Sequence, residues 1–305
     1  MIDDKLICAN YAAIDVGTNA VRLLIKHIEE QERKTVFTKE LLVRIPMRLG
    51  FDVFDTGYIS DVKAKKMVRL MKAYSQMMKL YDVADYRACA TSALRDAQNG
   101  KQLVKQIAEK TGIRIDIISG QEEATIIYNN HVEQMKDRSG NYMYVDVGGG
   151  STEINLLSDG KLVCSRSYNI GTIRLLNNAV SAEAWEKFVS DMKKIAADYP
   201  GTEIIGSGGN INKYYKLVDR AKEDTANQRV QTEALKAVYE KLCGMTVEQR
   251  MQAYKLKPDR ADVIVPAGKI FVTIADIIGA HFIYVPVIGL SDGIIDSLYV
   301  KNKRN

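Results

Sequence analysis

The sequence predicts a mixed α/β protein of two related domains that pack together across a cleft. At 305 residues the chain is too long for one ordinary hydrophobic core, and it suits two domains of about 150 residues each. The same succession of strand, glycine turn and strand opens the chain and returns near its middle. No linker rich in proline, glycine or serine separates the halves, so we expect them to pack against each other.

The first half begins with short apolar runs that predict strands. These strands are expected at residues 11–16, 21–28 and 35–43. A helix is expected from Ser60, which can act as its N-cap, to about Tyr81, because apolar residues recur there every three or four positions. The next elements are expected as a strand at 86–90, a helix at 100–111, a strand at 114–118 and a helix after Gly120.

The second half repeats this opening. Strands are expected at residues 142–147, 152–157 and 161–168. The tripeptide that begins at Asp146 lies 131 residues after the identical tripeptide at Asp15, and each ends a predicted strand. A shared tripeptide within the same order of elements indicates an internal duplication. Farther along, a helix is expected from Ile211, and residues 263–287 predict a buried helix followed by a strand.

Composition excludes several classes of function. Hydrophobic residues at 46% and charged residues at 27% are ordinary for a soluble globular protein. The first residues include acids and no long apolar segment, so we expect no secretory signal, no membrane association and a cytoplasmic location. Four scattered cysteines and three histidines lack the spacing of a zinc site. The net charge of +5 suits polyphosphate and nucleic acid equally, so charge alone does not identify a partner.

Two glycine-rich turns at equivalent places are the strongest functional signal. One begins at Gly17, after Asp15, and the other at Gly148, after Asp146. A strand follows each turn, which argues against a dinucleotide fingerprint, and no Gly-Lys-Ser/Thr sequence is present to form a Walker-type loop. Backbone N–H groups of such turns can approach phosphate oxygens closely. The pair therefore predicts phosphate and metal binding, with glycine turns that bind no ligand as the alternative.

A third glycine cluster follows the apolar residues 204–205. It contains Gly208 and Gly209 and precedes the helix that is expected from Ile211. Backbone amides at a helix N-terminus are natural ligands for anions or nucleotides. A plain turn between a strand and a helix is the alternative reading of this cluster.

Several motifs together resemble one known family. They are AAIDVGTNAVRLLI, CATSALRDAQNG, IISGQEEATIIY, YVDVGGGSTEINLL, IIGSGGNIN, DRADVIVPAG and GLSDGIIDSLY, in order over nearly the whole chain. This combination resembles the exopolyphosphatase/guanosine pentaphosphate phosphohydrolase (Ppx/GppA) family of the actin-like ATPase and sugar kinase superfamily. The resemblance implies two ribonuclease H-like domains with the site in the cleft between them. It also implies Mg²⁺-dependent release of terminal phosphate from polyphosphate, or conversion of guanosine pentaphosphate to tetraphosphate.

The resemblance also suggests domain limits and a short form of the family. The first domain is expected at residues 1–124, completed by a C-terminal helix at 290–305, and the second at 125–289. Longer members carry a C-terminal extension with an HD-type domain, which is not expected in a sequence that ends at residue 305. Ala20 replaces a serine that is frequent in the first motif of the family, which removes one hydroxyl donor.

Individual roles follow from the same resemblance. Glu123 matches the catalytic base, although an acid in the first turn of a helix would otherwise be read as a response to the helix dipole. Asp15, Asp146 and Glu153 match the expected Mg²⁺ ligands, since carboxylates are hard oxygen donors. The expected phosphate-binding residues are Gly17, Thr18, Asn19, Arg22, Arg95, Gly148, Gly149, Gly150, Ser151, Gly208 and Gly209. For Arg22 and Arg95, a surface salt bridge is the alternative.

Three functions are compatible with these observations. The first is a hydrolase of phosphoanhydride termini, which acts on polyphosphate or guanosine pentaphosphate rather than on nucleic acid. The second is an ATP-dependent small-molecule kinase of the same superfamily, and the third is a non-catalytic sensor of polyphosphate or of the nucleotide. We favour the hydrolase because a sensor needs no residue that activates water. The family resemblance is also compatible with a homodimer.

Overall fold

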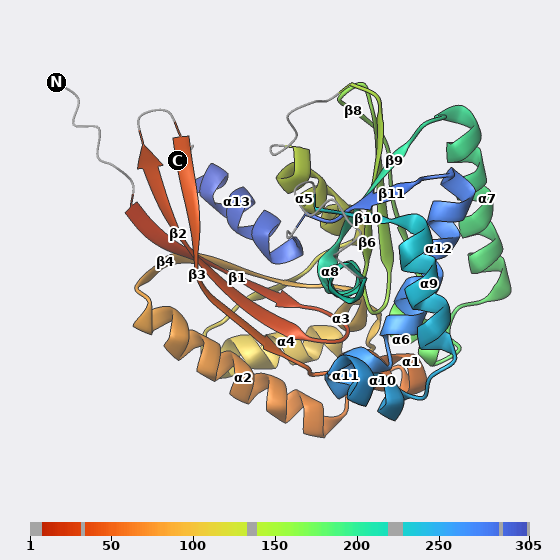
Figure 1. Cartoon of the computed structure of the whole chain (residues 1–305). Coiled ribbons are helices and arrows are strands. Elements are labelled where there is room, and N and C mark those ends of the chain that lie inside the picture. The colour runs from red at the N-terminus through yellow and green to blue at the C-terminus, as the bar shows by residue number, and fades with distance from the viewer. Residues whose placement is uncertain (1–7, 32–33, 133–138, 219–227, 287–288, 304–305) are drawn as a thin grey trace. The chain divides into compact units, whose positions relative to one another are not determined.

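The computed structural model describes residues 8–31, 34–132, 139–218, 228–286 and 289–303 (Figure 1). The chain divides into two compact units, which are described separately. Unit 1 comprises the chain up to Ser119 together with the segment from Leu290, and unit 2 comprises Gly120–Gly289. The division falls just before the helix that carries Glu123, so this helix belongs entirely to unit 2.

Unit 1 is built on a five-stranded sheet with the order β3-β2-β1-β4-β5. Its strands are β1 (Cys8–Val16), β2 (Val21–Gln31), β3 (Lys34–Ile45), β4 (Val83–Ala90) and β5 (Ile115–Ile117). β1 and β2 form an antiparallel hairpin, and β4 runs parallel to β1. All five strands lie where the sequence predicts them, with ends that differ by a few residues.

Helices cover both faces of this sheet (Figure 1). They are α1 (Leu49–Thr56), α2 (Asp61–Leu80), α3 (Ser92–Asp96), α4 (Gly100–Thr111) and α13 (Leu290–Lys303). α2 and α4 pack together on one face, and α13 contacts β1, β2 and β4 on the other. The Ser60 side chain caps α2 as predicted, by accepting a hydrogen bond from the Lys63 backbone. The predicted apolar stripe of α2 supplies its buried residues Met67, Met71, Tyr74 and Met78.

Unit 2 repeats the sheet of unit 1. Its strands are β6 (Asn141–Val147), β7 (Thr152–Ser158), β8 (Lys161–Tyr168), β9 (Glu203–Ser207), β10 (Arg229–Gln231) and β11 (Phe282–Tyr284). The order β8-β7-β6-β9-β11 corresponds strand for strand to β3-β2-β1-β4-β5, with β10 added at the edge. Strand directions agree as well, because β6 is antiparallel to β7 and parallel to β9. This correspondence supports the internal duplication.

The main core of unit 2 lies between its sheet and the helices of one face. The helices of this unit are α5 (Gly120–Val132), α6 (Thr172–Leu176), α7 (Ala182–Asp198), α8 (Gly208–Leu217), α9 (Thr232–Cys243), α10 (Val247–Tyr254), α11 (Pro258–Ala261) and α12 (Ile264–Ile278). The apolar stretch near the C-terminus forms α12 and β11, as predicted. α8 begins at Gly208 rather than at the expected Ile211. In the described part of the chain, no helix combines the length and the apolar character needed to cross a bilayer.

The second face of each sheet is covered by one helix. In the sequence, this helix comes directly after the last strand of the opposite unit. α5 follows β5 of unit 1 but packs on β7 and β8 of unit 2. α13 follows β11 of unit 2 and packs on β1, β2 and β4 of unit 1. The chain therefore passes from unit 1 into unit 2 through α5 and returns through α13.

Candidate functional site

The two glycine turns have the same hydrogen bond and the same register. The Gly17 N–H donates to the Ala20 carbonyl at 3.1 Å, and the Gly148 N–H donates to the Ser151 carbonyl at 2.9 Å. The flanking strands pair directly on either side of each turn. The two hairpins are therefore equivalent residue by residue, at the separation of 131 residues seen in the sequence.

The carbonyl groups of the three glycines in the second turn are all held by α6. Thr172 N binds Gly148 O at 3.0 Å, Ile173 N binds Gly149 O at 2.8 Å and Arg174 Nε binds Gly150 O at 2.9 Å. The C=O of a trans peptide and the N–H that follows it point in opposite directions. The N–H groups of Gly149, Gly150 and Ser151 therefore point away from α6. Successive N–H groups with a common direction form a concavity that favours anions.

The first turn is held in the same way by the start of α1. The Thr18 carbonyl accepts from Gly50 N at 3.0 Å, and the Asn19 carbonyl accepts from Arg48 N at 2.9 Å. By the same geometry, the N–H groups of Asn19 and Ala20 point away from α1. The two turns thus present backbone donors by one common device, a helix start that binds the turn carbonyls from behind.

The close approach of α6 to the second turn depends on Gly171, which the sequence analysis did not select. A Cβ atom at this position would lie 2.5 Å from backbone atoms of Gly149 and Gly150. No side chain fits there without moving the turn. The only signal in the sequence is a single glycine just before a helix, which is too common to indicate a site.

The side chains that flank the two turns differ in charge. In unit 1, Asp15 stands opposite Arg22, and the two form an ion pair at 2.6 Å. In unit 2, the equivalent positions are Asp146 and Glu153, which also stand opposite each other. The first hairpin therefore carries a neutralised pair of side chains, and the second carries two neighbouring acids.

The two acids of unit 2 lie in a row that crosses four strands. Ser207 of β9 is in register with Asp146, and Ser167 of β8 is in register with Glu153. The Ser207 hydroxyl donates to Asp146 Oδ2 at 2.7 Å, and the Ser167 hydroxyl donates to Glu153 Oε1 at 2.8 Å. These bonds fix the orientation of both carboxylates. The sequence analysis missed both serines, because their role depends on strand register.

Glu123 lies in the first turn of α5, where the residue is only 8% exposed. The start of this helix is fixed to the sheet next to it. Asn155 Nδ2 donates to the Ala124 carbonyl at 2.9 Å, and Gln121 Nε2 donates to Ser165 Oγ at 2.7 Å. Asn155 and Glu153 are two residues apart on β7, so their side chains share one face. Glu123 is therefore carried on the same face of the sheet as the acidic pair.

The third glycine cluster lies next to Asp146. Gly208 has a φ of +87°, and a Cβ atom there would lie 2.8 Å from Asp146 Oδ1. A Cβ atom at Gly209 would collide with the Arg260 guanidinium, whose Nη1 donates to Asn210 Oδ1 at 3.2 Å. Arg260 is thus a cation beside this turn that the sequence analysis did not select. Arg260 lies on α11 and the turn opens α8, so their proximity depends on the tertiary positions of these two helices and cannot be read from the sequence.

Positive charge accumulates along α8, from Arg260 beside its start to Lys216 in its last turn. Burial lowers the pKa of the Lys213 amino group, and the charges of Lys216 and Arg260 lower it further. Repulsion between these cations would be relieved by a bound anion.

The predicted site residues thus fall into two groups, one in each unit. In unit 2, the structure places the second turn, Gly208 and the acidic pair together, with Glu123 on the same face. In unit 1, it places the first turn together with Asp15 and Arg22. Arg95 lies on α3 and donates to the Ile118 carbonyl at 3.0 Å. The same helix is linked to the first turn, since the hydroxyls of Ser92 and Thr18 lie 2.7 Å apart.

The acidic pair could hold a divalent cation. Within the described residues, no cluster of three or more histidine, cysteine, aspartate or glutamate side chains is suited to a metal ion. Mg²⁺ rarely needs such a cluster, because it is commonly held by one or two carboxylates together with water and substrate phosphates. Asp146 and Glu153 match this donor set, whereas Asp15 is already paired with Arg22.

These features define a duplicated α/β protein of the actin-like ATPase fold with two equivalent glycine hairpins, and the comparisons with known proteins identify its family. The chain matches the Ppx/GppA phosphatase family over residues 24–302 and therefore belongs to it. It is 28% identical over 298 residues to a bifunctional 3-dehydroquinate synthase/phosphatase of Fusobacterium nucleatum. That match covers 90% of this chain but only 44% of the relative, so the chain spans less than half of its length.

Two further comparisons cover nearly whole proteins. Exopolyphosphatase 2 of Mycobacterium tuberculosis is 27% identical over 279 residues, which is 83% of this chain and 86% of the relative. The crystal structure of a Ppx/GppA family member from Aquifex aeolicus has a TM-score of 0.78 at 23% identity, over 98% of this chain and 100% of that chain. The resemblance to this phosphatase family and the fold class are thereby confirmed.

The contact between Gly208 and Asp146 gives a first prediction. Gly208→Ala should greatly reduce phosphate release, because the new methyl group displaces the Asp146 carboxylate. The matched control is Gly201→Ala, where φ is also positive, at +72°, but nothing lies within 4 Å of the added Cβ. Both variants should lose roughly 1–3 kcal/mol of stability from backbone strain, measured by thermal unfolding. Equal phosphate release by the two variants would contradict the assigned role of the Gly208 contact.

Proposed function

We propose that the protein hydrolyses the terminal phosphoanhydride bond of inorganic polyphosphate or guanosine pentaphosphate, with Mg²⁺ as its cofactor. The observation that carries this proposal is the second hairpin. It combines N–H groups directed away from α6 with two adjacent, oriented carboxylates at the ends of the flanking strands. A phosphate chain and its cation require this pairing of backbone donors with acidic side chains.

The turns supply binding and charge stabilisation. Phosphoryl transfer spreads negative charge over the oxygens of the transferred group, and fixed donors that face this charge lower the barrier. The N–H groups of Gly149, Gly150 and Ser151 are suited to this task, because α6 already holds the turn in shape. In unit 1, Asn19 and Ala20 offer the same kind of donor. Rigid donors require no rearrangement during the reaction.

Glu123 is our candidate for the general base. Its role would be to take a proton from the water that attacks the terminal phosphorus, a contribution typically worth about 10²–10⁴-fold. Two observations support this assignment. The side chain is almost fully buried, and the hydrogen bonds of Gln121 and Asn155 fix the helix turn that carries it.

Asp146 and Glu153 would hold Mg²⁺, with Ser207 and Ser167 as the groups that orient them. When bound, the cation would neutralise charge on the phosphate oxygens and help to align the terminal group. Asp15 was also expected as a ligand. Its ion pair with Arg22 instead suggests that its part is to position this arginine next to the first turn.

The choice between the two substrates rests on the relatives. Exopolyphosphatase 2 of Mycobacterium tuberculosis is named for polyphosphate, and it aligns with most of this chain. We therefore place polyphosphate first and the nucleotide second. Both end in the same phosphoanhydride, so the contacts of the turns would be shared.

The role of Glu123 gives a second prediction. Glu123→Gln should reduce phosphate release by roughly 10²–10⁴-fold while substrate binding persists. Release should be measured with Mg²⁺ from long polyphosphate and from guanosine pentaphosphate, side by side. Glu122→Gln is the matched control, because Glu122 is the preceding residue of the same helix turn and is exposed.

The outcomes of this measurement separate the candidate functions. Faster release from polyphosphate identifies an exopolyphosphatase, and faster release from the nucleotide identifies an alarmone phosphohydrolase. Tight binding without release by the wild type would replace the hydrolase with a sensor. Full activity of Glu123→Gln would show that another group activates the water.

The acidic pair gives a third prediction, about the metal. Glu153→Gln should raise the Mg²⁺ concentration required for half-maximal phosphate release by at least about tenfold, because one charged ligand is lost. Glu203→Gln, an exposed carboxylate at the start of β9, should leave this concentration unchanged. If both variants respond to Mg²⁺ like the wild type, the cation is not held by Glu153.

A further inference from the structure

The two helices that cover one face of the unit 1 sheet carry a concentration of positive charge. α2 and α4 together contain nine lysine or arginine residues and two acidic residues. Their formal charge is therefore +7, whereas the whole chain carries only +5. The helices pack against each other on the same face (Figure 1). All of the excess positive charge of the chain is thus accounted for by this one helical layer.

Most of these basic side chains face solvent. The exposed ones are Lys65, Lys66, Arg69, Lys72, Lys79, Lys101, Lys105 and Lys110. None of these eight forms an ion pair with any residue that the structure describes. Lys63 is different, because it is paired with Asp52. The charge of this surface is therefore available to a partner from outside the chain.

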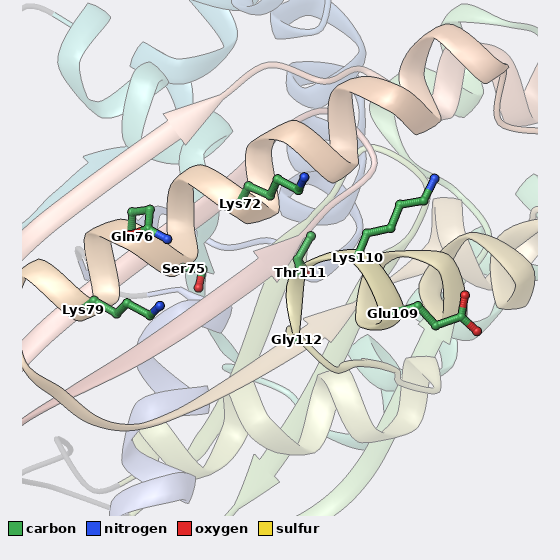
Figure 2. Close-up of a pocket in the computed structure, with 8 residues that line it drawn as sticks. All are labelled: Lys72, Ser75, Gln76, Lys79, Glu109, Lys110, Thr111 and Gly112. Atoms are coloured by element: carbon green, nitrogen blue, oxygen red, sulfur yellow. The ribbon is translucent and has the colours of Figure 1, made fainter.

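A groove of about 360 Å³ lies between the two helices (Figure 2). It is lined by Lys72, Ser75, Gln76 and Lys79 of α2 and by Lys110 and Thr111 at the end of α4. The lysines supply charge, and the hydroxyl and amide groups supply additional hydrogen bonds. Glu109 also borders the groove, but its side chain extends away from α2 (Figure 2).

The chemistry of this surface favours a polyanion without bases. Proteins that bind single-stranded nucleic acid combine basic grooves with aromatic side chains on which bases stack. α2 and α4 contain one aromatic residue, Tyr74, and it is fully buried. The two helices therefore offer contacts to phosphate oxygens but no exposed ring of their own. The tyrosines next to the groove, Tyr81 after α2 and Tyr86 of β4, are half-buried, and the Tyr86 hydroxyl is used in a hydrogen bond to the Gly112 carbonyl.

We propose that the α2–α4 groove and the lysines around it form a docking surface for inorganic polyphosphate, separate from the residues that act on its terminal phosphate. The proposal rests on the proposed function, because it assigns the polymer as the substrate. The surface would hold a segment of the chain remote from its reacting end. It would raise the affinity for long chains without taking part in hydrolysis.

The test compares Lys72→Glu/Lys79→Glu/Lys110→Glu with a matched control, Lys187→Glu/Lys193→Glu/Lys194→Glu. The control lysines are exposed on α7 and produce the same change in net charge. Binding of long-chain polyphosphate and of single-stranded DNA of equal charge is measured by fluorescence anisotropy, in EDTA and at several salt concentrations. Phosphate release is measured with tripolyphosphate and Mg²⁺. A triple Lys→Gln variant of the groove tests neutralisation without charge reversal.

The groove variant should bind long polyphosphate about tenfold more weakly or worse. The slope of log K for binding against log salt concentration should become shallower by roughly three, about one unit for each phosphate contact that is lost. The control variant should bind like the wild type, the Lys→Gln variant should be intermediate, and release from tripolyphosphate should be unchanged throughout. Equal weakening in the groove and control variants would overturn the proposal. So would loss of DNA binding with polyphosphate binding intact. If the wild type releases no phosphate while the binding results hold, the hydrolase fails and the docking surface stands.

Discussion

The direction of the peptide planes in the two glycine turns is the constraint on which the rest of the site depends. In each turn, the start of a short helix binds the carbonyl groups from behind, and the following N–H groups must then point the other way. The hydrogen bond across the turn also fixes the register of the hairpin. That register places the acids of unit 2 opposite each other and orients them through neighbouring serines.

The internal duplication places the same backbone hairpin in both units, with side chains of different charge beside it. At equivalent positions, unit 1 has Arg22 where unit 2 has Glu153, and each stands opposite an aspartate. The first pair is a short ion pair that keeps a cation beside the turn. The second pair is a concentration of negative charge that suits a metal ion. The two halves thus share their backbone donors and differ in side-chain charge, which fits a substrate that is both polyanionic and bound to a cation.

The sequence was sufficient for features that depend on local pattern. The strands around both glycine turns, the helix capped by Ser60 and the helix at 100–111 were predicted from periodicity, capping and turn residues. Features that depend on distant contacts were not predicted. Ser207 and Arg260 became visible only through strand register and helix packing, and the short helix α6 has too few residues for a periodic signal. α8 begins earlier than expected because its glycines were assigned to the preceding turn.

The central claim is that the N–H groups directed away from α6 bind phosphate, and amide chemical shifts test it most directly. Tripolyphosphate and Mg²⁺ would be titrated into ¹⁵N-labelled Glu123→Gln protein. The account predicts that the amides of Gly149, Gly150 and Ser151 shift together and saturably. The amides of Asp159 and Gly160, in the next hairpin turn of the same sheet, should not move. Saturable binding that leaves the three turn amides unshifted would contradict the account.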